Sequence, residues 1–220
     1  MSHKAVVLFS GGLDSTALLG YFQHAGFEPC ALSIDYGQRH IKELEAALKI
    51  TTFMKVKHQV VRLNHLRNIL KGSSLTSSNI NVPEGHYEDA SMKATVVPNR
   101  NMILMAIAGG YAISLGAKVV GIAAHSGDHA IYPDCRPEFL EAMRVAFRLC
   151  DYRELELQAP FANYTKEDVV LSGADMNVPL HLTWSCYKGE ELHCGVCGTC
   201  VERKEAFATS GISDPTGYNE

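Results

Sequence analysis

The sequence predicts an α/β fold, in which a parallel β-sheet carries helices on both faces. The run Ala5–Phe9 is apolar and rich in valine, as expected for a strand buried on both sides. A glycine turn and a helix follow it, and the strand-like runs Pro29–Asp35 and Val56–Leu63 continue the alternation around a helical pattern over 38–53. Strands and helices that alternate at these spacings form parallel sheets with right-handed crossovers.

The turn after the first strand, Ser10-Gly11-Gly12-Leu13-Asp14-Ser15-Thr16, predicts a phosphate site. Glycines let successive backbone N–H groups converge on one anion, and the helix that opens here adds its positive end. Ser10 and Ser15 offer hydroxyl groups, and Asp14 can cap the helix or help to hold Mg²⁺. An ordinary strand–turn–helix connection is the alternative, but the complete string directly after a buried strand favours phosphate. No Gly-Lys-Ser/Thr follows, so the turn is not a Walker A loop.

The bulk composition indicates a soluble enzyme with one main domain. The chain has 220 residues, 46% of them hydrophobic and 20% charged, with a formal net charge of −4. No block of lysine and arginine is present, so we expect no stable nucleic-acid binding. The first residues show no signal peptide, and the longest apolar run, Met102–Ile113, is too short to span a membrane. We therefore expect a cytoplasmic protein without a membrane partner.

The rest of the chain continues the same pattern. A polar stretch at 71–97 with little periodicity predicts a functional lid or a disordered loop. In the helix over 38–53, Ile41, Leu44, Ala47 and Leu48 form the expected buried stripe. Further elements are expected as helices at Met102–Leu115, from Pro137, at Lys166–Ala174 (with Thr165 and Asp168 as its cap) and at Val201–Thr209, and as strands at Lys118–Ala123 and Leu155–Leu157.

Three further polar segments lie where ligands bind in such sheets, beyond the carboxyl ends of the strands. Asp35–His40 follows the second strand, and its side chains suit a nucleotide, although a polar turn is the alternative. Pro98-Asn99-Arg100-Asn101 starts a helix with amides and a guanidinium that suit phosphate oxygens. Asp134, Arg136 and Glu138 place three charged groups near this edge, where a solvent-exposed helix start is the alternative to substrate contact.

Four of the seven cysteines predict a metal site. Cys186, Cys194, Cys197 and Cys200 fall within fifteen residues, with glycines between them that relieve tight turns. Four thiolates at this spacing fit a closed, tetrahedral and therefore structural Zn²⁺ site, one per chain. An iron–sulfur cluster and a redox-active set of cysteines are the alternatives.

Taken together, these motifs resemble a known family. The Ser-Gly-Gly-Leu-Asp-Ser string resembles the pyrophosphate loop of the ATP pyrophosphatases, which split ATP into AMP and pyrophosphate while adenylating an acceptor. With DYGQRH, PNRN, YPDCRPEF and the four cysteines in this order, the chain resembles the 7-cyano-7-deazaguanine synthase family from residue 4 to about 207. The resemblance implies a Rossmann-like sheet of the adenine nucleotide alpha hydrolase type at 1–180. It also implies a small zinc-binding segment at 181–220.

The resemblance further implies a carbon–nitrogen ligase that converts 7-carboxy-7-deazaguanine, free ammonia and ATP with Mg²⁺ into the 7-nitrile. The carboxylate and then the amide would be adenylated, and a homodimer is expected. Asn99 replaces a glycine of the family's motif but tolerates left-handed backbone angles. The implied catalytic residues are Ser10, Asp14, Ser15, Arg39 and Arg100. The implied ATP-binding residues are Phe9, Ser10, Gly11, Gly12, Leu13, Asp14, Ser15, Thr16, Tyr36, Gln38, Arg39, Arg100 and Asn101, and the implied substrate residues are Asp134, Arg136 and Glu138.

Three other functions stay open at this stage. A tRNA-thiolating relative shares the loop, but it needs a tRNA-binding surface and a cysteine that carries a persulfide. A diverged relative could attach a deazaguanine to a macromolecule in a defence system. A zinc-stabilised module that binds ATP without releasing pyrophosphate is the alternative that is not an enzyme.

Overall fold

The computed structural model of the chain describes residues 3–39, 41–87 and 89–219. The five strands are β1 (His3–Leu8), β2 (Phe27–Asp35), β3 (Lys57–Arg62), β4 (Val119–Gly121) and β5 (Glu156–Gln158). They form one sheet in the order β3-β2-β1-β4-β5, and every neighbouring pair is parallel. The predicted parallel α/β sheet is therefore confirmed.

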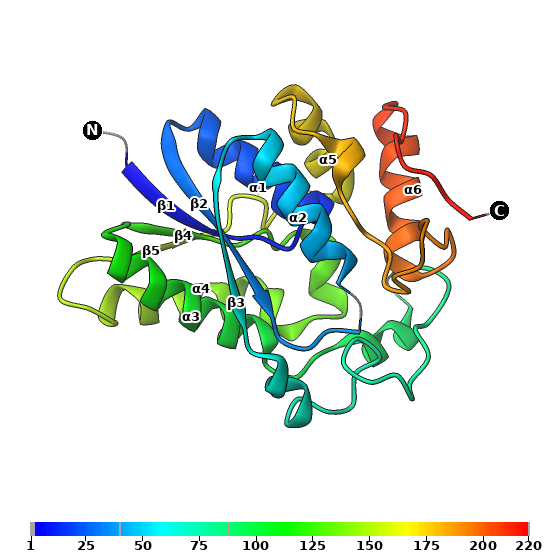
Figure 1. The fold of residues 1–220 in the computed structure, drawn as a ribbon, viewed down its shortest axis with the longest axis horizontal. Coiled ribbons are helices and arrows are strands. Elements are labelled where there is room, and N and C mark those ends of the chain that lie inside the picture. Colours follow the sequence, from blue (N-terminus) through cyan, green and yellow to red (C-terminus); the bar gives the residue numbers. More distant parts are fainter. Residues whose placement is uncertain (1–2, 40, 88, 220) are drawn as a thin grey trace.

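Helices cover both faces of this sheet (Figure 1). The helices are α1 (Leu13–His24), α2 (Lys42–Phe53), α3 (Arg100–Leu115), α4 (Pro137–Leu149), α5 (Lys166–Asp175) and α6 (Gly198–Ser210). Alternate strand residues point to opposite faces, so Val6 packs with α3 and α4 while Ala5 and Val7 pack with α1 and α2. The two apolar layers bury the strands on both sides, which explains why the strand sequences are continuous hydrophobic runs.

The second helix differs from its prediction. It begins at Lys42 rather than at Gln38, because the side chain of Gln38 turns back and accepts a hydrogen bond from the Tyr36 N–H. Ile41 and Leu48 of the predicted stripe are 58% and 61% exposed, so that part of the prediction is wrong. Ala47 of the stripe is buried as predicted, and the other buried residues of the helix are Ala46, Ile50 and Thr51.

The long segment between β3 and α3 is packed onto the C-terminal part of the chain (Figure 1). It contains a short 3₁₀ helix at Ala90–Thr95 and buries Tyr87 and Met92. Gly85 N–H donates to the carbonyl of Val196 over 3.1 Å, and Glu84 forms a β-bridge with Cys197. This segment and the cysteine-rich region thus form one wall beside the sheet.

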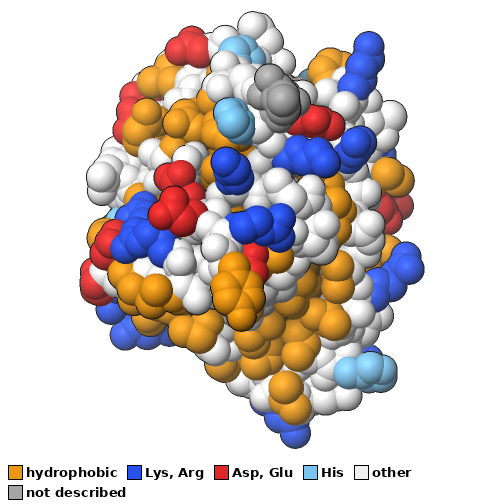
Figure 2. All heavy atoms as spheres, turned by 90° about the vertical axis from the view of Figure 1, so that its left-hand side faces the viewer, with side chains coloured by type: hydrophobic (Ala, Val, Ile, Leu, Met, Phe, Trp, Pro, Cys, Tyr) orange, Lys and Arg blue, Asp and Glu red, His pale blue; other side chains and the backbone are white. Residues whose placement is uncertain are grey.

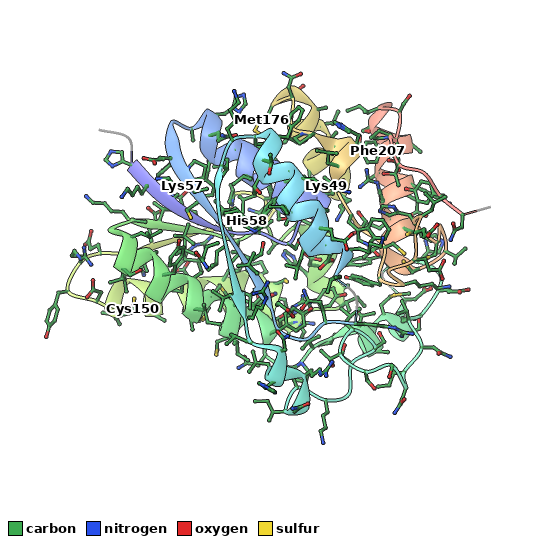
Figure 3. The ribbon with its side chains drawn as sticks, viewed as in Figure 1. Lys49, Lys57, His58, Cys150, Met176 and Phe207 are labelled. Atoms are coloured by element: carbon green, nitrogen blue, oxygen red, sulfur yellow. The ribbon has the colours of Figure 1, made fainter. Side chains whose placement is uncertain are left out.

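Helix α6 is anchored by a buried arginine and by apolar contacts. Arg203 is fully buried, and its guanidinium donates to Thr183 Oγ1 over 2.7 Å and pairs with Asp214 over 3.1 Å. Phe207 lies on the side of α6 that faces α5, where it packs with Leu13 of α1 (Figure 3). Through these contacts α6 is held against the end of α1 that starts at the glycine turn.

Among the described residues, no helix is long and apolar enough to cross a membrane. Figure 2 shows hydrophobic side chains gathered over the lower part of one face of the molecule. Independently, the end of α4 exposes large apolar side chains, with Val145 at 42% and Leu149 at 78% exposure.

Candidate active site

A cavity of about 250 Å³ lies beyond the carboxyl ends of β1, β2 and β4. One side is formed by the turn after β1, from Phe9 to Ser15, and another by Tyr36 and Arg100. Trp184 and Thr199 close it from the C-terminal part of the chain. In parallel sheets ligands bind at this edge, so the cavity stands where the sequence predicts an active site.

The turn after β1 is held in one conformation from both sides. Gly11 has φ +88°, and a Cβ atom there would lie 2.3 Å from the Glu43 carbonyl oxygen of α2. Ser10 Oγ accepts from the Gly12 N–H over 3.1 Å and lies 3.1 Å from Ser15 Oγ. In the described part of the chain, no side chain caps the N-terminus of α1, which leaves this end of the helix able to receive an anion.

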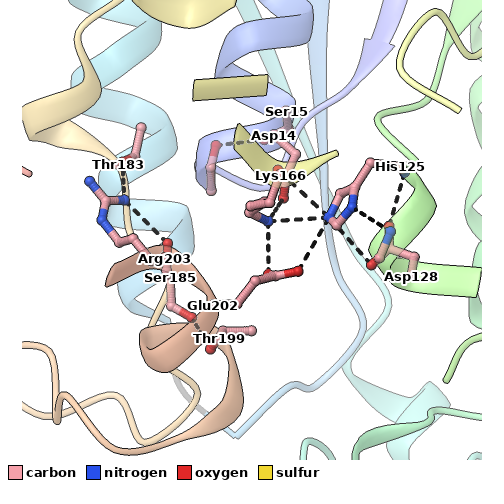
Figure 4. A network of polar contacts seen from close by, with 12 residues as sticks. Asp14, Ser15, His125, Asp128, Lys166, Thr183, Ser185, Thr199, Glu202 and Arg203 are labelled. Carbon is pink, nitrogen blue, oxygen red and sulfur yellow. Dashed lines mark hydrogen bonds and ion pairs between the residues drawn. The ribbon is translucent and has the colours of Figure 1, made fainter. Parts of the chain in front are cut away.

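A charged network links this turn to helices α5 and α6 (Figure 4). Lys166 Nζ lies 2.8 Å from Asp14 Oδ2 and 3.1 Å from Glu202 Oε2. Burial raises the pKa of Asp14, but Lys166 and His125 outweigh burial and hold it below its ordinary value. Burial lowers the pKa of Lys166, yet the neighbouring carboxylates raise it overall. Both groups are therefore charged at neutral pH.

His125 and Asp128 extend the network from the loop after β4. His125 is 1% exposed, and its Nε2 lies 3.9 Å from both Asp14 Oδ1 and Glu202 Oε1 and 3.6 Å from Asp128 Oδ1. Tyr87 OH donates to Asp128 Oδ1 over 3.0 Å. Three carboxylates thus lie around His125 Nε2, and two of them, Asp14 and Glu202, also pair with Lys166.

A second group of polar residues lies across the cavity. Arg100 NH1 is 3.4 Å from Tyr36 OH, and its guanidinium lies 6.0 Å from the centre of the Tyr36 ring. Burial raises the pKa of Glu43, the nearby charge of Arg100 offsets part of that rise, and the net result is a pKa of about 7. Asn99, which precedes α3, has φ 56°, so the expected left-handed conformation is confirmed. The start of α3 therefore presents Arg100 to the cavity opposite the glycine turn.

The structure brings together most of the residues predicted from the sequence. The cavity is lined by eleven of the expected ATP-binding residues, namely Phe9, Ser10, Gly12, Leu13, Asp14, Ser15, Tyr36, Gln38, Arg39, Arg100 and Asn101. Gly11 and Thr16 lie behind the turn, where Gly11 faces α2 and Thr16 Oγ1 donates to the Gly12 carbonyl over 2.8 Å. Arg39 NH1 donates to the carbonyl of Ile80 over 3.1 Å. His40 lies outside the described residues.

The three residues predicted to bind the substrate do not line the cavity. Asp134 Oδ2 accepts from the Asn101 N–H over 2.9 Å, and Arg136 Nε donates to the His129 carbonyl over 2.9 Å. Glu138 is exposed on the first turn of α4. Tyr132 and Cys135 of the same segment do reach the cavity. Burial raises the pKa of the Cys135 thiol, which makes it a poor nucleophile.

The four cysteines of the C-terminal segment converge. The sulfur atoms of Cys186, Cys194, Cys197 and Cys200 all lie within 4.8 Å of one another, and all four residues are buried. Backbone N–H groups of Cys194 and Cys197 point at two of the sulfurs over 3.4 Å and 3.3 Å. A tetrahedral site with Zn–S bonds of about 2.3 Å needs sulfurs roughly 3.8 Å apart, so the cluster fits such a metal. Cys150 lies far from it, at the other end of the molecule (Figure 3).

Two residues of the charged network have no recognisable sequence motif. Lys166, which lines the cavity, follows the capping residue Thr165 directly, and Glu202 lies within helix α6. Their approach to Asp14 depends on the tertiary packing of α5 and α6 against α1. The sequence signals at these positions indicate only helices, so local analysis could not find them.

The fold and the cavity define a class of protein, and the comparisons with known proteins place the chain within it. The parallel sheet with its glycine turn has the fold of the ATP pyrophosphatases. An NH₃-dependent NAD synthetase from Campylobacter jejuni matches with a TM-score of 0.50 and 14% identity over 83% of this chain and 67% of that one. A 4-thiouridine synthetase, solved with RNA and bound ATP, matches with a TM-score of 0.51 and 17% identity over 80% of this chain and 41% of that one.

The family model described as queuosine biosynthesis protein QueC matches residues 4–211, and the chain belongs to this family. A relative from Psychromonas ingrahamii named 7-cyano-7-deazaguanine synthase is 49% identical over 220 residues, which is 100% of both chains. Another of the same name from Caldicellulosiruptor bescii is 51% identical over 215 residues, or 98% of this chain and 97% of the relative.

Proposed function

We propose that this protein is an ATP-dependent carbon–nitrogen ligase that converts 7-carboxy-7-deazaguanine and ammonia into 7-cyano-7-deazaguanine. The observation that carries this proposal is full-length identity of 49% to a relative of that name, together with a cavity at the glycine turn. The substrate carboxylate attacks the α-phosphate of ATP and releases pyrophosphate. Ammonia then displaces AMP to give the amide, and a second adenylation of the amide oxygen, followed by loss of AMP, gives the nitrile.

Each step requires stabilisation of the negative charge on the phosphate groups and does not require a covalent nucleophile from the protein. The turn from Ser10 to Ser15 and the N-terminus of α1, which line the cavity, are proposed to bind the pyrophosphate as its charge develops. Arg100, and Arg39 at the rim, offer guanidinium groups to the remaining phosphate oxygens. Mg²⁺ bound with ATP supplies further charge neutralisation, and Asp14 is the residue that would hold it. The ring of the deazaguanine substrate is proposed to lie against Tyr132 and Tyr187, which also line the cavity.

The cysteine cluster is proposed to hold one structural Zn²⁺ per chain. Four thiolates leave no open coordination position, so the metal supplies rigidity rather than chemistry. The backbone N–H of Trp184 donates to the Gly11 carbonyl over 3.0 Å. Trp184 lies two residues before Cys186, so a rigid cluster would help to hold the glycine turn. Residues 181–220 are accordingly proposed as a zinc-binding segment on a nucleotide-binding domain at 1–180. Cysteines that bind Zn²⁺ must not be oxidised to disulfides, which supports a reducing, cytoplasmic location.

A homodimer is part of the same proposal. Leu149 and Tyr152, near the end of α4, are both largely exposed. Exposed apolar side chains of this size commonly mark a contact surface. Sedimentation or scattering of the pure protein gives the oligomeric state directly.

The test of the function is incubation of the pure protein with 7-carboxy-7-deazaguanine, an ammonium salt, Mg²⁺ and ATP, followed by mass spectrometry. The expected products are the nitrile, AMP and pyrophosphate. Formation of AMP without the nitrile would contradict the proposed acceptor but not the adenylating chemistry. ADP in place of AMP, or no nucleotide turnover, would contradict the proposed reaction class.

A further inference from the structure

A chain of hydroxyl groups begins in the core and ends at the wall of the cavity. Thr95 is fully buried, and its Oγ1 donates to the Met92 carbonyl over 2.7 Å. Tyr132 OH lies 2.7 Å from Thr95 Oγ1 and 3.3 Å from Tyr187 OH. Both tyrosines line the cavity, so the chain connects a buried backbone carbonyl with the place where a ligand binds.

The direction of the hydrogen bonds in this chain is fixed by its buried end. A carbonyl oxygen only accepts, so the single proton of the Thr95 hydroxyl is committed to Met92. Tyr132 then donates to Thr95, and Tyr187 donates to Tyr132, because any other arrangement makes two oxygen lone pairs face each other. The Tyr187 oxygen therefore presents only lone pairs to the cavity. A ligand that bonds to it has to supply an N–H or O–H group.

Glu43 adds a second acceptor to the same cavity. It lies in the first turn of α2, and among the described residues no group donates a hydrogen bond to its carboxylate. Burial raises the pKa of Tyr36, and Arg100 lowers it. The charges of Glu43 and Tyr132 raise it further, so both groups lie within electrostatic reach of the Tyr36 hydroxyl. An ionised carboxylate only accepts, and Glu43 thus makes the same demand on a ligand as the end of the hydroxyl chain.

We propose that Glu43 and Tyr187, here called the acceptor pair, bind the edge of the substrate base that carries the ring N–H and the 2-amino group. A deazaguanine offers N–H donors side by side along this edge, and they meet the two acceptors. Thr95 and Tyr132 are positioning residues, because they determine where the Tyr187 proton points. This inference rests on the proposed function, and it names the part of the site that selects a 2-amino-substituted base.

The acceptor pair also keeps two bases apart. The proposed reaction needs the adenine of ATP and the deazaguanine in one cavity at the same time. Adenine carries a ring nitrogen without a proton beside its amino group, so it leaves one acceptor facing a lone pair. A buried acceptor without a donor costs free energy, and the pair therefore disfavours adenine in the place of the substrate base.

The test is carboxylate-dependent exchange of pyrophosphate into ATP, measured with 7-carboxy-7-deazaguanine and with the analogue that lacks its 2-amino group. The wild-type protein is expected to prefer the amino-bearing acid about 10²-fold in kcat/KM, because the analogue leaves an acceptor unpaired. Glu43→Gln and Tyr187→Phe are each expected to reduce this preference to less than about tenfold. Glu45→Gln, at an exposed carboxylate on the same helix, is the matched control and is expected to keep it.

Thr95→Val tests the fixed direction of the hydroxyl chain. It removes the acceptor of the Tyr132 proton, so Tyr132 can donate to Tyr187 and the Tyr187 proton can turn into the cavity. The preference for the amino-bearing acid is expected to fall as far as in Tyr187→Phe, although Thr95 itself does not line the cavity. Thr95→Ser keeps the hydroxyl and is expected to restore the preference. The double variant Thr95→Val/Tyr187→Phe is expected to lose no more than Tyr187→Phe alone, because Thr95 acts through Tyr187.

The possible results separate the parts of the inference. Equal kcat/KM for the two acids in the wild-type protein would overturn the acceptor pair. A preference that survives Glu43→Gln or Tyr187→Phe would overturn the part given to that residue. A preference that survives Thr95→Val but not Tyr187→Phe would overturn the fixed direction of the chain. Absence of exchange with either acid in the wild-type protein would instead contradict the proposed function.

Discussion

Lys166 Nζ and Asp14 Oδ2 lie 2.8 Å apart although 152 positions separate them in the chain. Asp14 belongs to the turn that we propose binds pyrophosphate, and Lys166 is the first residue of α5. The lysine is 14% exposed in its side chain, and Glu202 is its second anionic partner at 3.1 Å. Lys166 therefore balances the charge of two carboxylates at the edge of the cavity.

Replacing Lys166 by methionine is expected to leave Asp14 and Glu202 facing each other without compensation. Loss of one partner of a buried ion pair costs about 3 kcal/mol of unfolding free energy, and loss of a preorganised charge lowers the rate about 10²-fold. Urea unfolding measures the loss of stability. Carboxylate-dependent exchange of pyrophosphate into ATP, which reports the first adenylation, measures the loss of rate. Lys49→Met, at an exposed site on α2 (Figure 3), is the control and should change neither. A Lys166→Met protein with wild-type exchange would show that this cation has no part in the first half-reaction.

Alanine at Gly11 is expected to be far more harmful than alanine at Gly26. Both glycines have positive φ, +88° and +81°, so both substitutions incur backbone strain of about 1 kcal/mol. Only at Gly11 would the new Cβ lie 2.3 Å from the carbonyl oxygen of Glu43, whereas nothing lies within 4 Å at Gly26. Gly11→Ala should therefore displace the turn from α2 and weaken ATP binding, while Gly26→Ala should not. Equal ATP affinity in the two variants, measured by calorimetry, would count against a fixed turn.

Serine at Cys197 is expected to remove the bound metal, because it takes one thiolate from a four-sulfur set. The melting temperature should fall and the zinc content should drop from about one per chain towards zero. Elemental analysis of the purified protein gives the metal and its amount. Cys150→Ser, at an exposed cysteine outside the cluster, should keep both. Iron and inorganic sulfide in the wild-type protein would instead support an iron–sulfur cluster.

Glu43 is expected to make the protein less stable as the pH rises from about 4.5 to about 7. Burial raises its pKa from 4.5 to about 7 in the folded state, so the folded state binds the proton more tightly than the unfolded state does. The stabilisation is complete below the unfolded pKa and is lost as the pH passes through the folded pKa, with an upper limit of about 3 kcal/mol. The difference in unfolding free energy between wild type and Glu43→Gln, measured across this range, isolates the effect. A difference that does not vary with pH would contradict the raised pKa.

The sequence predicts those parts of the fold in which local pattern and tertiary packing agree. The strands are buried on both faces and are apolar runs in the sequence. The turn after β1 has a glycine at position 11, where the backbone adopts a positive φ of 88°. The capping pair Thr165 and Asp168 is confirmed by reciprocal hydrogen bonds. The cysteine spacing likewise predicts the cluster, because all four ligands are close in sequence.

The incorrect and missing predictions have a common physical origin. Ile41 and Leu48 have the spacing of core residues, but Ile41 precedes the first turn of α2, and the helix packs through Ala46, Ala47, Ile50 and Thr51, which leaves Leu48 in solvent. Lys166 reaches the cavity, and Glu202 reaches Lys166, only because α5 packs against α1 and α6 packs against α5, which no local pattern reveals. Residues brought together from distant segments are thus the part of the site that required the structure.

The contact of Trp184 N–H with the Gly11 carbonyl has a consequence for protein synthesis. The cavity wall includes Thr199, so the turn at Gly11 leaves the ribosome well before the residues that face it across the cavity. A nascent chain therefore carries the phosphate turn long before it carries the residues that close the cavity over it. Enclosure of a nucleotide has to wait until Trp184 and Thr199 have been synthesised, and a chain released before then keeps the turn but lacks the enclosure.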